Sequence, residues 1–168
     1  MIFETILDDL IPYNKDYKEA LYNLKKKSPG IKKSNSGGWH SENIINLMSF
    51  TSLKRVIQYT IQKENLLNSV DFYSMWGNIN PTSSWNERHN HSGYALSGCY
   101  YIQIGLTAGN FLIEEDDDYF NLPSTTEIIP QTGMLILFDA EYYHSVNTNL
   151  SNYDRISIAF NLGKNDGR

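Results

Sequence analysis

From about residue 70 onward, the sequence consists of short apolar runs rich in tyrosine, isoleucine and phenylalanine, separated by clusters of glycine, proline, asparagine and aspartate. Runs of this length and composition between turn-forming residues are typical of β-strands. The expected strands lie near 70–79, 95–104, 111–115, 126–129, 133–139, 143–147 and 155–161. Seven short strands separated by turns predict a β-sandwich or a jelly roll.

The residues before this region favour helices. Apolar side chains over 17–24 recur at i, i+3, i+4 and i+7, which predicts an amphipathic helix. Asn14 can cap its start, and the turn residues at 28–30 can end it. Two further short helices are expected, one beginning after Ser41 and one near Thr51.

The chain of 168 residues falls within the usual size of one domain, and it contains no repeats or linkers. We expect a single domain over 1–168, with a mostly helical layer over 1–69 packed on a β core over 70–163. Sequential antiparallel strands with helices along one outer face suit a double-stranded β-helix, the jelly-roll core that cupins also have. The expected fold class is therefore α+β, mainly β.

Charge and cysteine content limit the partners and the compartment. A net charge of -5 and a pI near 5.3 leave no excess of basic residues to neutralise phosphates, which argues against nucleic acid as a partner. Cys99 is the single cysteine, so no intrachain disulfide can form and the cytoplasm is the expected location. No apolar run approaches the roughly 18 residues that a membrane span needs, so no membrane partner is expected.

Three of the four histidines lie in the predicted β region, as His89, His91 and, about fifty positions later, His144. On an extended segment, residues i and i+2 project to the same side, so the first two can face one ion and a distant strand can supply the third ligand. Imidazole suits iron, zinc, copper and nickel, so ligand type alone does not select the metal. A surface loop without any ligand role could also carry this histidine pair.

The last predicted strand, 155–161, alternates polar and apolar residues, which puts Arg155, Ser157 and Asn161 on one face. An arginine inside a small barrel is costly unless it is paired, and its planar fork matches a carboxylate. A bound dicarboxylate would satisfy it. The alternative is an ion pair with the acidic run 114–118 or with Asp154, although Asp154 is the adjacent residue and should point to the opposite side.

Several ordered motifs together resemble the 2-oxoglutarate- and iron(II)-dependent oxygenases, and within them the small oxygenases of bacteria and phages. The motifs are SNSGGWHS at 34–41, WGNIN at 76–80, HNHSGYALSGCYYIQ at 89–103, GMLILFDAEYYHSV at 133–146 and RISIAFN at 155–161. The resemblance implies that iron(II) and 2-oxoglutarate are the cofactors and that O2 is a co-substrate. It implies hydroxylation of an unactivated C–H bond with release of succinate and CO2, in a bacterial cell or a phage-infected host cell.

The same resemblance implies that His89, His91 and His144 hold the iron. The chain departs from the family pattern at His91, because two histidines and one carboxylate are expected and a carboxylate would stand there. A three-histidine site can still bind iron(II), although it neutralises one positive charge fewer. The alternative is a two-histidine site in which His91 is the first ligand and Gly93 stands at the carboxylate position. Asp139 is a second departure, because relatives tend to have proline there.

For the co-substrate, the resemblance implies that Arg155, eleven positions after His144, grips the distal carboxylate of 2-oxoglutarate together with Ser157. The 2-oxo acid end would then chelate the iron. Tyr100 or Tyr101, on a neighbouring strand, could donate a hydrogen bond to the co-substrate. No catalytic residue is expected beyond the metal ligands.

Two other functions fit the same residues. One is a cupin-type enzyme with three histidine ligands that does not use 2-oxoglutarate, and the other is a non-catalytic jelly-roll binding module. Trp39, Trp76 and Asn78 also match the oxygenases, although a tryptophan in a strand more often packs in a core. The substrate cannot be derived from the sequence, because loops build the pocket walls. A protein side chain or a small metabolite is expected rather than nucleic acid.

Overall fold

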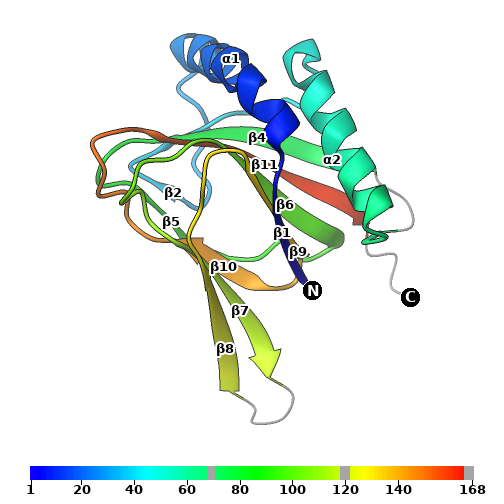
Figure 1. Ribbon diagram of the computed structural model, residues 1–168. Helices are drawn as coiled ribbons and strands as arrows, with labels where there is room; N and C mark the ends of the chain where they lie inside the picture. The colour runs from blue at the N-terminus through cyan, green and yellow to red at the C-terminus, as the bar shows by residue number, and fades with distance from the viewer. Residues whose placement is uncertain (68–70, 118–121, 165–168) are drawn as a thin grey trace.

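The computed structural model describes residues 1–67, 71–117 and 122–164 of the chain, as two antiparallel β-sheets with two helices outside one of them (Figure 1). The helices are α1 (Asn14–Lys27) and α2 (Thr51–Lys63), and 3-10 turns span Asp8–Tyr13 and Met48–Phe50. The strands are β1 (Ile2–Ile6), β2 (Asn35–Ser36), β3 (Trp39–His40), β4 (Phe72–Asn80), β5 (Trp85–His89), β6 (Tyr94–Gln103), β7 (Phe111–Asp117), β8 (Leu122–Ile128), β9 (Met134–Asp139), β10 (Tyr143–Val146) and β11 (Arg155–Lys164). Within the described residues, no helix has the length and apolar character needed to cross a bilayer.

The large sheet has the order β1-β9-β6-β11-β4-β3, and the small sheet has the order β2-β5-β10-β7-β8. From β4 to β7, consecutive strands alternate between the large sheet and the small sheet, as in a jelly roll. Apolar side chains from both sheets meet in one cluster, to which β6 and β9 contribute from the large sheet and β7 and β10 from the small sheet. The predicted double-stranded β-helix fold is therefore confirmed.

The large sheet buries both of its faces, and its central strand β11 shows how the sequence achieves this. Ile156, Ile158 and Phe160 are fully buried on the outer face, in the core that the two helices cover. Arg155 and Ser157 are also buried, but they face the small sheet, as the alternation predicts. The polar row of β11 thus lies between the two sheets.

Four strands were not expected from the sequence. β1 pairs with β9 along its whole length, and the amino group of Met1 contacts the carboxylate of Asp139 at the end of β9. β2 and β3 are only two residues long. β5 has the polar sequence WNERH, which lacks apolar alternation because most of its side chains are exposed or half-buried. The first 69 residues thus contribute β1, β2 and β3 as well as helices.

The two main predicted helices, α1 and α2, are present, but two local expectations were wrong. Asn14 does not cap α1; it is the first residue of the helix, and its side chain donates to the carbonyl of Ile102 at 3.0 Å. No helix follows Ser41, because the backbone there pairs with β4 instead. The N–H of Ser41 donates to Gly77 at 2.9 Å and that of Ile44 donates to Met75 at 2.8 Å.

Most of the predicted strands agree with the structure. The predicted strand at 126–129 corresponds to the C-terminal part of β8, and the others correspond to β4, β6, β7, β9, β10 and β11. Val70, the first residue of the first predicted strand, and Asp118, the last residue of the acidic run, lie outside the described residues. Glu114 and Glu115 of that run belong to β7.

The contact between α1 and β4 gives a test of the helix layer. Leu21 is fully buried, and a Cβ atom on Gly77 would lie only 2.3 Å from Leu21 Cδ2, so the helix packs directly on the strand backbone. We expect Leu21→Ala to lower the free energy of unfolding by about 2–5 kcal/mol, because it leaves a cavity in this core. Leu106→Ala removes the same atoms from a fully exposed side chain and should change it by less than about 0.5 kcal/mol. Urea unfolding measures both, and equal effects would contradict the packing.

Candidate active site

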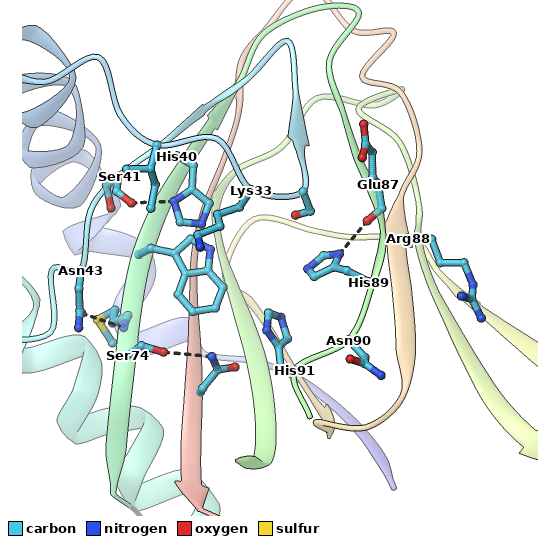
Figure 2. A pocket seen from close by; sticks show the side chains of 15 residues that line it. Lys33, His40, Ser41, Asn43, Ser74, Glu87, Arg88, His89, Asn90 and His91 are labelled. Carbon is cyan, nitrogen blue, oxygen red and sulfur yellow. Dashed lines mark hydrogen bonds between the residues drawn. The ribbon is translucent and has the colours of Figure 1, made fainter. Parts of the chain in front are cut away.

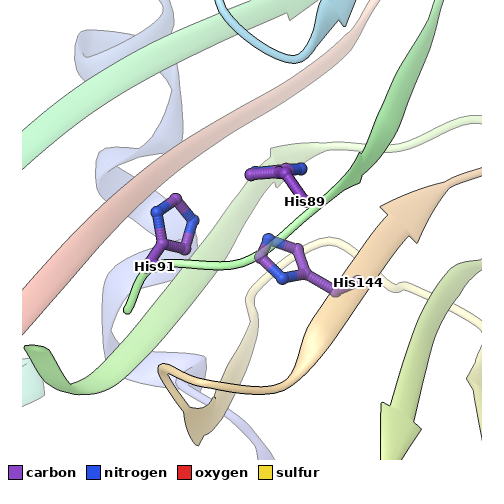
Figure 3. Close-up of side chains that lie close together, drawn as sticks. All are labelled: His89, His91 and His144. Carbon is purple, nitrogen blue, oxygen red and sulfur yellow. The ribbon is translucent and has the colours of Figure 1, made fainter. Parts of the chain in front are cut away.

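Three histidines converge on the inner face of the small sheet. His89 ends β5, His91 follows two residues later, and His144 lies on β10 directly opposite His89 in the strand register. The ring centroids of His89 and His144 are 4.2 Å apart, and His91 lies 5.0 Å and 5.1 Å from them. Figure 3 shows the three rings gathered around one point, and one nitrogen from each lies within 4.8 Å of the others. This geometry can hold a single metal ion.

The backbone sets the orientation of two of these rings. Nδ1 of His89 lies 2.7 Å from the carbonyl oxygen of Glu87, and Nδ1 of His144 lies 3.3 Å from that of Tyr142. A carbonyl accepts only from a protonated Nδ1, so Nε2 carries the lone pair in both rings. Burial lowers the pKa of His89, that of His91 to about 4 and that of His144 to about 2. All three rings are therefore neutral at pH 7, which is the form that binds a metal.

Arg155 lies on the facing large sheet with only 1% of its surface exposed. Its Nη1 donates to the carbonyl oxygens of Ala108 and of Asn147, the latter at 2.8 Å, and its Nη2 donates to Asn86 Oδ1 at 3.3 Å. Burial lowers the pKa of the guanidinium. Three neutral oxygens satisfy part of its donor fork, and a bound carboxylate would supply the charge that they lack.

The alternative partners considered for Arg155 are engaged elsewhere. The carboxylate of Asp154 accepts a hydrogen bond from Tyr22 on the helix side of the sheet. Glu114 of the acidic run forms an ion pair with Arg88 on the outer face of the small sheet. In the described parts of the chain, Arg155 therefore has no ion pair with a carboxylate.

One cavity between the sheets connects the histidine cluster to Arg155. Its lining includes Ser157, and it includes the carboxamides of Asn78 and Asn80 on β4. The Oδ1 atoms of these two asparagines are buried and have no hydrogen-bond partner among the described residues. A buried polar atom of this kind normally pairs with a ligand or a water molecule. Carboxamide oxygens accept hydrogen bonds, so these two need a donor such as a water molecule, whereas Arg155, Ser157 and Tyr101 supply donors for an anion in the same lining. The inner cavity, as we call it, thus combines the histidine cluster with hydrogen-bond donors for a polar, anionic molecule.

The two candidate tyrosines face opposite sides of β6. Tyr100 lies on the helix side, where its hydroxyl donates to Asn14 Oδ1 at 2.9 Å, so it does not line the inner cavity. Tyr101 lines the inner cavity and hydrogen-bonds to Cys99. Burial raises the pKa of Tyr101 well above its usual value, so its hydroxyl stays protonated and can donate. The structure brings only Tyr101 to the site.

Sequence reasoning missed Asn86, which lies three residues before His89 and should by simple alternation point to the opposite face. Both side chains line the inner cavity. The register explains this: His144 pairs with His89, whereas Val146 pairs with Asn86, so β5 holds one extra residue in between. Such a β-bulge shifts the side-chain alternation by one, and a sequence alone does not reveal it.

A second, outer cavity of about 560 Å³ opens onto the histidine cluster, because both cavities share Ser34, Trp76, His89 and His91 (Figure 2). Sequence reasoning also missed His40, which lines it. The ring of His40 stacks on Trp76 at 5.5 Å, and its Nδ1 lies 2.6 Å from the carbonyl oxygen of Ser41. The sequence displays the motif that contains His40, SNSGGWHS at 34–41. The contact of His40 with Trp76, however, depends on the pairing of β3 with β4. Trp39, in contrast, packs in the helix-side core.

Comparison with known proteins agrees with this geometry. Residues 74–161, more than half of the chain, match the family described as "Putative 2OG-Fe(II) oxygenase". The chain belongs to this family of 2OG-Fe(II) oxygenases. A search of curated protein sequences returned no match.

Solved structures show that the oxygenase has the fold of other enzymes of this kind. A prolyl-4-hydroxylase from Pseudomonas putida is 11% identical, with a TM-score of 0.73 over 97% of this chain and 92% of that chain. The epimerase SnoN from nogalamycin biosynthesis is 11% identical, with a TM-score of 0.79 over 97% and 77%. HygX from Streptomyces hygroscopicus, crystallised with nickel and 2-oxoglutarate, is 10% identical, with a TM-score of 0.75 over 98% and 83%.

Membership of the family confirms the predicted enzyme class and cofactors, whereas hydroxylation stays a prediction. The oxygenase uses iron(II) and 2-oxoglutarate, with O2 as the other co-substrate. The cluster of three histidines fits iron binding. The finer assignment to small bacterial and phage oxygenases stays a prediction.

Proposed function

We propose that His89, His91 and His144 ligate the iron(II) of this oxygenase. Two observations support the proposal: the ring nitrogens of the three histidines converge, and backbone carbonyls orient two of the rings. Bound iron(II) together with 2-oxoglutarate and O2 supplies the oxidation that converts a C–H bond into a C–OH bond, with succinate and CO2 as the other products. The chain holds the metal and orients the reactants around it.

We also propose that Arg155 binds the distal carboxylate of 2-oxoglutarate. The observation that carries this assignment is a buried guanidinium that has no carboxylate partner among the described residues and lines the same cavity as the histidine cluster. Ser157 and Tyr101 can donate hydrogen bonds to the same carboxylate, since both line this cavity and are paired in the strand register. The unpaired Oδ1 atoms of Asn78 and Asn80 accept rather than donate, so they would contact a bound water molecule and not the carboxylate.

Aromatic side chains shield His144 from water. Phe111 stacks on its ring with a centroid distance of 5.5 Å, and Phe138 lies 4.6 Å from it. Both phenylalanines are buried and line the inner cavity. A low-polarity wall on this side strengthens electrostatic contacts to the bound co-substrate.

The outer cavity is the proposed substrate site. Its charged side chains are those of Lys33 and Glu87, because the side chain of Arg88 points away from the cavity and is paired with Glu114. Most of the remaining polar lining consists of uncharged Ser and Asn side chains, and Trp76 forms an aromatic wall beside the metal cluster. This lining suits an uncharged, hydrogen-bonding part of a small metabolite or a protein side chain. It offers no cluster of cations for phosphates, which also supports the expectation that nucleic acid is not the substrate.

We further propose that residues 1–168 form a single oxygenase domain. Support comes from the prolyl-4-hydroxylase from Pseudomonas putida, which matches 97% of this chain and 92% of its own. Location in the cytoplasm of a bacterial or phage-infected cell stays a prediction.

The co-substrate assignment predicts the result of an anaerobic titration. Adding 2-oxoglutarate to the iron(II)-loaded protein should produce the weak visible charge-transfer absorption of a chelated 2-oxo acid, and this absorption should saturate. Arg155→Ala should raise the concentration needed for saturation at least about tenfold, because a charge-assisted bidentate contact is lost. Tyr101→Phe should raise it less.

Two controls accompany this titration. Arg55→Ala removes an exposed arginine on α2, and Tyr100→Phe removes a hydroxyl on the helix side of β6; neither should alter the titration. No absorption band despite bound iron would favour a three-histidine enzyme that does not use 2-oxoglutarate. No bound iron at all would favour a non-catalytic binding module.

Single histidine variants test the metal assignment. His89→Ala, His91→Ala and His144→Ala should each weaken iron(II) binding at least tenfold, since each removes one ligand. Equilibrium dialysis under anaerobic conditions measures this affinity. If His89→Ala binds iron as tightly as the unaltered protein, the alternative two-histidine site with Gly93 at the carboxylate position is correct. His40→Ala is the matched control, because it removes a histidine outside the cluster.

The substrate proposal predicts which compounds stimulate succinate release. Uncharged compounds that carry hydroxyl or amide groups should stimulate it. Their phosphorylated derivatives should not, because the outer cavity does not offer two free cationic side chains to bind a phosphate group. Trp76→Ala should raise the concentration of compound that gives half-maximal stimulation. Preferential stimulation by the phosphorylated member of each pair would overturn the proposal.

A further inference from the structure

A row of three side chains crosses the outer face of the small sheet, on the strands that carry the metal-binding histidines. Arg88 on β5 donates from Nε and Nη2 to both carboxylate oxygens of Glu114 on β7, at 2.6–2.9 Å. Its guanidinium carbon lies 3.7 Å from the ring centroid of Tyr143, on the intervening strand β10. In Figure 2 the Arg88 side chain points away from the pocket, so this contact lies outside the cavity.

This row lies directly behind the histidine cluster. Arg88 precedes His89, and Tyr143 precedes His144; adjacent residues of a strand project to opposite faces of the sheet. The register places Tyr143 beside Glu114 and His144 beside His89. The outer contact and the inner pair of rings therefore share the same stretch of backbone on both strands.

The backbone ladder between the two ligand-bearing strands is short and irregular. β5 and β10 have a register shift between the pair at His144 and the pair at Val146, whereas β10 and β7 pair regularly over four residues. On its other side, β5 pairs only with the two-residue strand β2, at Trp85 and Asn86. A bulge locally disrupts the ladder, so next to His89 the backbone is held by its register pair with His144 and by the N–H groups of Glu87 and His91, which donate to the carbonyls of Ser34 and Ala140 at 2.8 Å. A contact between side chains across the three strands adds to this limited ladder.

We propose that Arg88 is a positioning residue that fixes His89 relative to His144 and thereby sets the affinity of the site for its metal. The proposal rests on the metal centre proposed above. The guanidinium spans from β5 across β10 to β7, and it combines a bidentate carboxylate contact with stacking on an aromatic ring. Lysine cannot reproduce this geometry, because its ammonium group is a point charge without a planar fork.

An exposed ion pair usually contributes little to folding stability, so a stability measurement alone would not reveal this role. The direction in which the metal affinity changes distinguishes a positioning role from a purely electrostatic one. Removing the positive charge of Arg88 relieves its Coulomb repulsion with a nearby divalent cation, so this effect alone should strengthen metal binding. Loss of positioning should weaken it, because ligand orientation is lost.

Cobalt(II) is a suitable probe, because its visible spectrum reports the geometry of its ligands and binding needs neither 2-oxoglutarate nor O2. We expect Arg88→Ala to bind cobalt(II) about tenfold more weakly, with an altered visible spectrum and a thermal midpoint of the metal-free protein close to that of the unaltered chain. Arg88→Lys should restore only part of the affinity. Lys63→Ala is the matched control, because Lys63 also belongs to an exposed ion pair, with Glu64 at 3.9 Å, but lies on α2.

The outcomes separate this inference from the proposed metal centre. If the unaltered protein binds no cobalt(II), the metal centre itself is wrong. If it binds cobalt(II) and Arg88→Ala binds equally tightly or more tightly, the metal centre stands and the positioning role of Arg88 is overturned. Equal weakening by Arg88→Ala and Lys63→Ala would also overturn it, because the effect would then be general to surface cations.

Discussion

The burial of Arg155 between two sheets is the constraint on which the site depends. A guanidinium with almost no exposure needs oxygen partners, and the chain provides two backbone carbonyls and the carboxamide of Asn86 rather than a carboxylate. A permanent internal carboxylate would neutralise the charge and close the site to an anionic co-substrate. An incomplete ion pair would leave Arg155 available for the co-substrate, as we propose, while the three neutral oxygens hold the guanidinium in position.

The two faces of the large sheet have different roles: one packs the apolar core, and the other lines the candidate active site. The outer face carries a continuous apolar core under α1 and α2, whereas the inner face carries the polar rows of β4 and β11. Tyr100 and Tyr101 illustrate the division, since one hydroxyl joins the sheet to α1 and the next lies in the inner cavity. The apolar core on the outer face can offset the cost of buried, incompletely paired polar groups on the inner face.

Much of this arrangement could be predicted, because it follows from alternation. The polar face of β11 and the convergence of His89, His91 and His144 depend on a period of two, which a sequence displays directly. β5 and Asn86 could not be found, because a bulge changes that period without any residue that marks it. The absence of a helix after Ser41 has a similar origin: its backbone groups pair with β4, and this long-range contact overrides a local helical pattern.

The proposed ligand set of three neutral imidazoles would also change the charge balance between the sheets. A carboxylate at the position of His91 would cancel one of the two positive charges of the metal, and the histidine leaves both. The dianion of 2-oxoglutarate would neutralise them, and Arg155, which lines the same cavity, would add one positive charge. In the proposed arrangement, the inner cavity with its reactants would therefore carry a small net positive charge. The other polar side chains of the inner cavity include uncharged carboxamides rather than further cations. This lining is consistent with a site in which the metal and Arg155 would already balance the charge of the co-substrate.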